Sequence, residues 1–182
     1  MQSSVSPLPP LNTEELPFPR KSLENPKAMV ELMKSCGRSK DLTKARKIHT
    51  YIHEKKLHNN DIHVNNALIT MYGRCGETHE AEGVFMKMKA KNVVTWSALI
   101  GGYARHGFGE EALKCFRHMR DSGVCPNAVT YICVLKACGI VGSLDVGEDI
   151  DAEVRKQGLL ENDIILGNAL IDMYSKCGAL EK

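Results

Sequence analysis

The seven cysteines are the residues of this chain most able to do chemistry, as nucleophiles, disulfide partners or metal ligands. No two of them have the Cys-x-x-Cys spacing of zinc ligands, and even Cys133 and Cys138 are five positions apart. Cys36 and Cys138 lie 102 positions apart, and so do Cys75 and Cys177. Cysteines that recur at one fixed spacing occupy a copied structural position. We therefore predict that they fill a core as small apolar side chains and hold no metal.

His49 and His53 have the i, i+4 spacing that places two imidazoles on one face of a helix, where they could share a metal ion. Lys47, Glu54 and Lys55 surround them, so we expect a solvated polar face instead. The chain also lacks a phosphate-binding glycine loop, a Gly-x-Ser-x-Gly motif and a His-x-Glu deaminase motif. The residues predict no enzyme, no cofactor and no small-molecule substrate.

The same 102-residue spacing organises the whole chain. Residues 135–139 repeat 33–37, and residues 168–178 repeat 66–76 almost letter for letter. Self-similarity at a fixed spacing is the signature of a repeat architecture. The elements that position any functional residue must therefore be repeated elements.

Each block contains several smaller units, because the apolar pattern restarts within it. Trp96, Leu99, Ile100 and Tyr103 are spaced for one face of an amphipathic helix, and a second such pattern follows a glycine break at 107–109. Each unit is therefore a helical hairpin, which cannot bury its faces alone and must stack on its neighbours. We predict an all-α, right-handed solenoid of stacked antiparallel hairpins. The registers give units at 26–61, 62–92, 93–127 and 128–163, and an incomplete unit at 164–182.

The two ends of the chain differ from these units. Residues 1–25 are rich in proline without apolar periodicity, which predicts a disordered leader that is a weak organellar transit peptide. At the other end, the predicted helix 167–177 has no second helix to cover Leu170, Ile171 and Tyr174, so we expect a fragment of a longer protein. No apolar run approaches the roughly 18 residues of a membrane span, and we expect no membrane partner.

One polar position recurs from unit to unit. Twelve residues after the start of each unit stand Arg38, Arg74, Arg105, Ile140 and Lys176. Stacked units would align the four cations into a row that matches a chain of phosphates. The alternative is that helix C-termini favour basic residues through the helix dipole. The residues alone favour neither explanation.

The chain resembles the pentatricopeptide repeat proteins, in particular the plant subclass in which long, short and standard repeats alternate. The resemblance covers about 26–182 and rests on the motifs at 93–100 and 167–178 and on the 36, 31 and 35 residue lengths. The competing family is the tetratricopeptide repeat, a protein-binding module, whose signature is partly matched. However, Ile100 stands where its glycine would be, and the units are not 34 residues long.

The resemblance implies binding of single-stranded RNA, one base per repeat, by the first helices. The fifth and last residues of a unit would read the base edge, which gives Asn66 with Asn92, Ser97 with Asn127, and Asn168 without a partner. The first pair resembles a reader of cytosine over uracil, and the second an adenine reader. The long units place Val30 and Ile132 at the reading position, so these units would space rather than read.

Two further sets of contacts follow from the same resemblance. The second residue of a unit would pack on the plane of the base, and the basic row would approach phosphates. The packing residues would be His63, Val94, Val129 and Ile165, and the phosphate residues Arg38, Arg74, Arg105 and Lys176. His63 departs from the aliphatic side chains at this position.

Proteins of this subclass often recognise sites of C-to-U editing or other RNA processing in mitochondria or plastids, and many end in a zinc deaminase domain. No such domain occurs in these 182 residues. A separate deaminase or another editing-complex protein would therefore be a partner. A protein-binding scaffold and a truncated product without its own function remain the alternatives.

Overall fold

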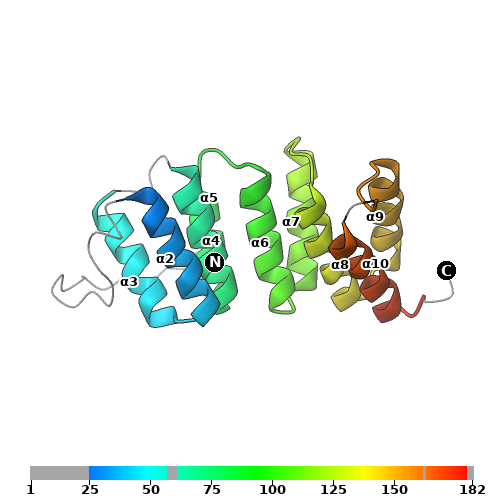
Figure 1. Ribbon diagram of the computed structural model, residues 1–182, viewed down its shortest axis with the longest axis horizontal. Coiled ribbons are helices and arrows are strands. Elements are labelled where there is room, and N and C mark those ends of the chain that lie inside the picture. The colour runs from blue at the N-terminus through cyan, green and yellow to red at the C-terminus, as the bar shows by residue number, and fades with distance from the viewer. Residues whose placement is uncertain (1–24, 57–60, 162, 180–182) are drawn as a thin grey trace, which may run out of the picture.

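The computed structural model describes residues 25–56, 61–161 and 163–179. Within these ranges the chain forms nine α-helices and no β-strand, which confirms the all-α prediction (Figure 1). The leader predicted at 1–25 lies outside the described residues apart from Asn25. The helices are α2 (Pro26–Ser39), α3 (Leu42–Glu54), α4 (Ile62–Cys75), α5 (Thr78–Lys87), α6 (Val93–Arg105), α7 (Gly109–Asp121), α8 (Ala128–Val141), α9 (Leu144–Lys156) and α10 (Ile164–Lys176).

The helices stack as hairpins along one long axis (Figure 1). The first helix of each hairpin contacts the first helix of the next, so that α2, α4, α6, α8 and α10 form one continuous layer. The second helices α3, α5, α7 and α9 each contact their own first helix and the first helix of the following hairpin. Among the described residues, helices contact one another only within a hairpin or between neighbouring hairpins. This arrangement confirms the predicted solenoid, in which each unit is stabilised by its neighbours.

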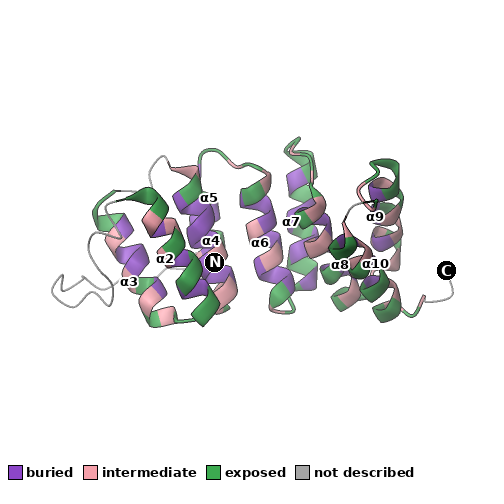
Figure 2. Ribbon diagram, viewed as in Figure 1, coloured by how far each residue is buried: buried purple, intermediate pink, exposed green. Residues whose placement is uncertain are grey.

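The first helices carry most of the core because they have neighbours on three sides (Figure 2). In α4 the buried residues form an almost unbroken run from Val64 to Ile69 and resume at Met71. In the outer helix α9 only Gly147, Ile150 and Val154 are buried. Two chemically different helix types therefore alternate along the chain, and the layer of first helices is held the more rigidly.

Close contact between first helices depends on glycine. A methyl group on Gly73 of α4 would meet the Cα atom of Gly102 of α6 at 3.1 Å, which is closer than ordinary carbon atoms pack. The neighbouring His106 secures the same junction, with its Nε2 2.8 Å from the carbonyl oxygen of Gly73. The position and tilt of α6 on α4 are thus set by backbone contact.

The cysteines that were predicted to pack do so at both copied positions, although to different depths. Cys36 and Cys138 are fully buried, while Cys75 and Cys177 are half-buried, and all seven cysteines are free thiols. In the described part of the chain no group of three or more His, Cys, Asp or Glu residues could hold a metal ion. None of the helices described there has the length and apolar character that a membrane span requires.

The solvated face expected around His49 is wrong for that residue. His49 is buried, and its Nδ1 lies 2.9 Å from the hydroxyl of Tyr72 on the next hairpin. Asp151 and Tyr174, which lie 102 positions after His49 and Tyr72, make the equivalent contact. The Tyr174 hydroxyl donates a hydrogen bond to the Asp151 carboxylate at 2.9 Å. This position of a second helix faces the first helix of the next hairpin, so the polar residue there links the two hairpins.

The last helix also differs from expectation. It begins at Ile164 rather than at 167, because the Asp163 side chain accepts a hydrogen bond from the Leu166 amide at 3.0 Å and caps it. Leu170 is buried rather than uncovered, because α10 packs on α8. Ile171 does remain 63% exposed, as expected.

Candidate nucleic-acid interface

The first predicted reading pair, Asn66 and Asn92, is in direct contact. The Nδ2 of Asn66 donates a hydrogen bond to Oδ1 of Asn92 at 3.4 Å. Asn66 is buried, and its own Oδ1 has no hydrogen-bond partner. Rotating the amide by 180° would set Oδ1 of Asn66 against Oδ1 of Asn92, which are both acceptors, so the orientation with an unsatisfied oxygen is the favoured one. A buried polar atom without a partner is costly unless a ligand supplies one.

The second predicted pair, Ser97 and Asn127, is joined through a third side chain. The Ser97 hydroxyl lies 2.7 Å from the Thr130 hydroxyl, which in turn donates to Oδ1 of Asn127 at 3.0 Å. Ser97 is buried, and the carbonyl oxygen of Val93, at 2.7 Å from its hydroxyl, competes with Thr130 for its single proton. Thr130 was not among the predicted site residues. The signal for it is the Asn-x-x-Thr spacing of a capping box, which occurs at both 92–95 and 127–130.

The last residue of each reading pair also caps the next first helix. Oδ1 of Asn92 accepts from the Thr95 amide at 3.0 Å, and Oδ1 of Asn127 accepts from the Thr130 amide at 3.0 Å. Because the cap occupies the carbonyl oxygen, it orients the side chain and leaves the amide NH₂ group as the part able to bind a ligand. Helix capping thereby turns each asparagine into an oriented hydrogen-bond donor.

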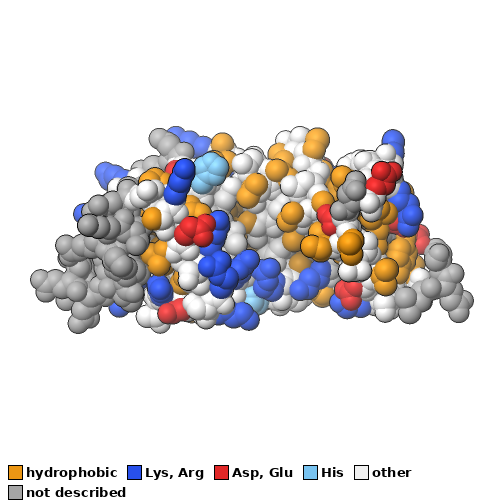
Figure 3. Space-filling view, in the orientation of Figure 1, with side chains coloured by type: hydrophobic (Ala, Val, Ile, Leu, Met, Phe, Trp, Pro, Cys, Tyr) orange, Lys and Arg blue, Asp and Glu red, His pale blue; other side chains and the backbone are white. Residues whose placement is uncertain are grey.

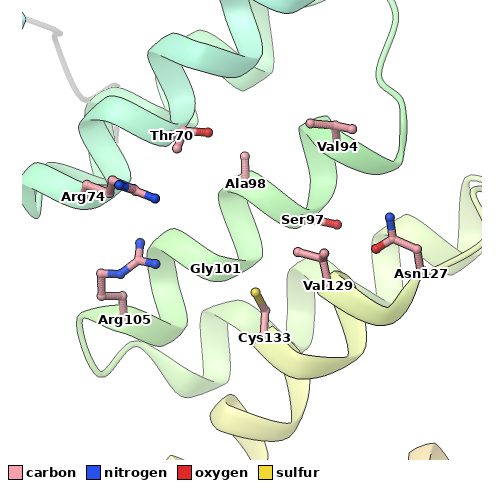
Figure 4. A pocket seen from close by; sticks show the side chains of 10 residues that line it. All are labelled: Thr70, Arg74, Val94, Ser97, Ala98, Gly101, Arg105, Asn127, Val129 and Cys133. Carbon is pink, nitrogen blue, oxygen red and sulfur yellow. The ribbon is translucent and has the colours of Figure 1, made fainter. Parts of the chain in front are cut away.

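A groove of about 280 Å³ between α6 and α8, bounded also by Thr70 and Arg74 of α4, brings six of the predicted residues together (Figure 4). Ser97 and Asn127 lie at one end with the two packing valines, and two arginines lie at the other end (Figure 4). The lining residues that were predicted are Arg74, Val94, Ser97, Arg105, Asn127 and Val129. Those that were not predicted are Thr70, Ala98, Gly101 and Cys133. Each of these lies one helical turn from a predicted residue of its own helix, which is the spacing that could have identified them.

Gly101 keeps the middle of the groove open. A methyl group at this position would come within 3.0 Å of the Cys133 sulfur and fill the space between the two helices. Burial raises the pKa of the Cys133 thiol, although the nearby charges of Arg105 and Lys136 act in the opposite direction. The thiol is therefore neutral near pH 7 and forms an apolar floor rather than a nucleophile.

The predicted packing residues are unusually exposed for their type. Val94 is 52% exposed, Val129 58% and Ile165 68%, and His63 is also exposed. Apolar side chains that recur on one face without a protein partner mark a surface for a ligand. Val94 and Val129 flank the groove from α6 and α8, so a flat apolar ring could lie between them.

The predicted cations differ in their surroundings. Arg38 and Arg105 are exposed, and Arg74 is half-buried with its aliphatic stem over Gly37, where an added methyl would meet its Cδ at 3.1 Å. Figure 3 shows Lys and Arg side chains gathered along the lower middle of this face. Lys176, in contrast, forms an ion pair with Asp172 at 2.6 Å.

Seven predicted residues do not line the groove: Arg38, His63, Asn66, Asn92, Ile165, Asn168 and Lys176. Asn168 and Ile165 are both exposed on α10, the last helix described. His63 belongs to α4, which contributes Thr70 and Arg74 to the groove but not His63. The groove between α6 and α8 therefore brings together all three kinds of predicted residue, for reading, packing and phosphate contact.

Comparison with known families identifies the repeats. Family models described as PPR repeat family, PPR repeat and pentatricopeptide repeat domain match residues 91–139, 66–93 and 116–177. The chain is built from pentatricopeptide repeats. All residues that line the groove lie within the segments matched by these models.

Curated pentatricopeptide repeat-containing proteins of Arabidopsis thaliana show the same similarity over most of this chain. A chloroplastic one is 35% identical over 156 residues, which is 86% of this chain and 25% of that protein. A mitochondrial one is 38% identical over 155 residues, which is 85% of this chain and 33% of that protein. The chain thus spans about a quarter to a third of the length of these two relatives.

Solved pentatricopeptide repeat structures share the fold. The chain matches the protein PPR10 in complex with an 18-nt psaJ RNA element with a TM-score of 0.71 at 20% identity, covering 86% of this chain and 23% of that one. It matches PPR10 from maize with a TM-score of 0.60 at 28% identity over the same shares.

Proposed function

We propose that this chain binds single-stranded RNA along its layer of first helices, with one base in each junction between repeats. The observation that carries the proposal is the groove between α6 and α8, where six residues predicted from sequence line one cavity. The base would lie between Val94 and Val129, its edge would meet Ser97 and Asn127, and its phosphate would lie near Arg74 and Arg105. PPR10, which has the same fold, is solved in complex with an 18-nt RNA element, and this supports RNA as the ligand.

We propose adenine as the base at this junction. Ser97 is small and its hydroxyl is already held by Val93 and Thr130, so it leaves room for a purine. The NH₂ group of Asn127 can donate to a ring nitrogen on the purine edge. A site of a given size rejects a wrong base only weakly, whereas a hydrogen bond to the base edge discriminates strongly. Asn127 would therefore carry most of the discrimination between bases.

At the preceding junction we propose cytosine over uracil. The unsatisfied oxygen of Asn66 needs a donor, and the exocyclic amino group of cytosine supplies one where uracil has a carbonyl oxygen. The long repeats would not read bases. Their residues at the same position, Val30 and Ile132, are half-buried and packed against the core.

We further propose that the parent protein belongs to the plant subclass with alternating long, short and standard repeats, and acts in a mitochondrion or plastid. The alternating unit lengths and the chloroplastic and mitochondrial names of relatives support this. The role would be to recognise sites of RNA processing or C-to-U editing, with a deaminase as a separate partner protein. That role rests on the resemblance, and the groove supports only the RNA-binding step.

A competition experiment tests the RNA-binding proposal. The full chain is titrated against a labelled pool of randomised single-stranded RNA, and duplex DNA of equal length competes. We expect duplex DNA to compete poorly, because a base must leave its stack to enter the groove. The test variant is Val94→Asp with Val129→Asp, which should abolish binding. The control is Met86→Asp, a change of another exposed apolar residue on α5, which should not. Equal binding of RNA and duplex DNA, or a protein ligand that competes for the groove, would favour a different function.

A further inference from the structure

Ile140 interrupts the row of basic residues that end the first helices. This residue packs against the start of α7 instead. A methyl group on Gly109, at the start of α7, would meet Cγ2 of Ile140 at 3.1 Å. Val141 crowds the same glycine even more closely. The end of α8 thus turns apolar side chains onto α7. A cation at position 140 would exchange this contact for charge, so the phosphate contact of this repeat must come from elsewhere or be missing.

Lys136 lies one helical turn before Ile140 on the same face of α8. It is three residues after Cys133 and seven after Val129, which both line the groove. Its side chain is exposed and makes no ion pair with the described residues. Four methylene groups span about the 5.4 Å of one turn, so its ammonium can reach the level of position 140 on α8, where the other repeats carry their cation. Burial raises the pKa of Cys133, which lines the groove, and the charges of Arg105 and Lys136 both act to lower it.

Comparison of the two long repeats explains why Lys136 is free. The residue 102 positions earlier is Lys34, which Glu31 neutralises at 2.7 Å, while Arg38 remains unpaired. In the later repeat, Cys133 replaces the acid and Ile140 replaces the arginine. The later repeat therefore lacks both the arginine and the acid that would neutralise Lys136. Each long repeat keeps one unpaired cation.

The fifth repeat shows the opposite charge arrangement. Asp172 stands at the position equivalent to Lys136, and it pairs with Lys176 at 2.6 Å. The two charges cancel on this face of α10. When the paired charges Lys34 with Glu31 and Asp172 with Lys176 are left out, each of the first four repeats has one cation at these positions and the fifth has none.

We propose that Lys136 supplies the phosphate-binding cation of the fourth repeat and that Asp172 removes Lys176 from the row. The phosphate track is then Arg38, Arg74, Arg105 and Lys136. This inference rests on the proposed RNA binding and revises one of its predicted contacts. The ninth residue of a repeat, such as Lys136 or Asp172, therefore helps to determine how many phosphates the surface binds.

The salt dependence of RNA binding tests the inference on the full chain. For a single strand, log K against log salt has a slope of about −0.7 per phosphate, so four contacts give about −3. We expect Lys136→Gln to make the slope shallower by about 0.7 and to weaken binding about fivefold at 0.1 M salt. Lys136→Arg should keep the slope. Asp172→Asn should steepen it by about 0.7, and Lys176→Gln should leave it unchanged.

Two further variants separate failure of the inference from failure of RNA binding itself. Lys114→Gln removes an exposed charge from the outer helix α7 and should leave the slope unaltered. Arg105→Gln should lower the slope if the groove binds RNA at all. A lowered slope in Arg105→Gln with none in Lys136→Gln, or a lowered slope in Lys176→Gln, would overturn the inference alone. If Arg105→Gln has no effect either, the RNA-binding proposal fails and the inference fails with it.

Discussion

The hydroxyl groups of Ser97 and Thr130 lie 2.7 Å apart and join α6 to α8 across the groove. The Thr130 hydroxyl also holds the Asn127 side chain that caps α8. One threonine therefore couples the cap of a helix, the junction between two repeats and the orientation of both proposed reading residues. Stability and base recognition share this hydroxyl, and the two roles can be separated by substitution.

Thr130→Val should destabilise the chain by about 1–2 kcal/mol. Valine keeps the shape but loses the hydroxyl of the capping box and leaves Ser97 without this neighbour. Urea unfolding followed by circular dichroism measures the change. Thr130→Ser keeps the hydroxyl and should lie much closer to the parent chain. Equal stability of the valine and serine variants would show that the hydroxyl network contributes little.

Ser97→Asn should move the preference of the third repeat from adenine toward pyrimidines. The longer amide fills the space that a purine needs and recreates the Asn66 and Asn92 pair, with an effect of roughly 1–3 kcal/mol at that base. Selection from a randomised RNA pool gives the preference. The serine is buried, so a melting curve must first show that the variant folds. An unchanged preference in a folded variant would contradict the reading assignment.

Arg74→Gln combined with Arg105→Gln should reduce the magnitude of the salt slope for RNA binding by about 1.4. Both side chains line the same groove, and neither has an ion pair with the described residues. Helix-dipole stabilisation is the competing explanation for these cations. If that explanation holds, the double variant will lose a few tenths of a kcal/mol of stability while its slope stays at the parent value.

Gly73→Ala should destabilise the chain by about 1–3 kcal/mol, because the new methyl would press on the backbone of Gly102 and separate α4 from α6. Gly83→Ala is the matched control. Gly83 lies within α5 with no other group near the added methyl, so alanine should stabilise that helix by about 0.5–1 kcal/mol. Opposite signs for the two variants in urea unfolding are expected. Two effects of the same sign would contradict the backbone contact.

Stability should fall as the pH rises above about 9. Burial raises the pKa of Cys36 to about 11, and that of Cys115 and Cys138 to about 12. The unfolded thiols ionise near 9, while the folded ones stay neutral, so unfolding releases protons in this range. The stabilisation is complete below pH 9 and is lost progressively toward pH 12. Urea midpoints at pH 7, 9 and 10 measure it, and a midpoint that stays constant to pH 10 would refute it.

Much of the fold follows from sequence because a solenoid is built from local and nearest-neighbour contacts. The 102-residue spacing and the i, i+3, i+4 pattern of residues such as Trp96 and Tyr103 are enough to predict helical hairpins and their order. The residues at 97, 127 and 129 could be singled out for the same reason, since every repeat presents the same position on the same face. The unit boundaries and the roles of these residues remain predictions.

Contacts between repeats could not be read from the pattern, because they depend on which side chain meets which across an interface. The link from His49 to Tyr72, the bridge through Thr130 and the backbone contact of Gly73 with Gly102 all belong to this class. The charges along the inner surface are a different case. Lys176 and Asp172 are four residues apart on one helix, a spacing that sequence shows, but only the folded chain brings them to 2.6 Å and leaves Lys136 without an ion pair among the described residues. Residue type determines which charges exist, and the distances in the folded chain decide which of them remain available to a ligand.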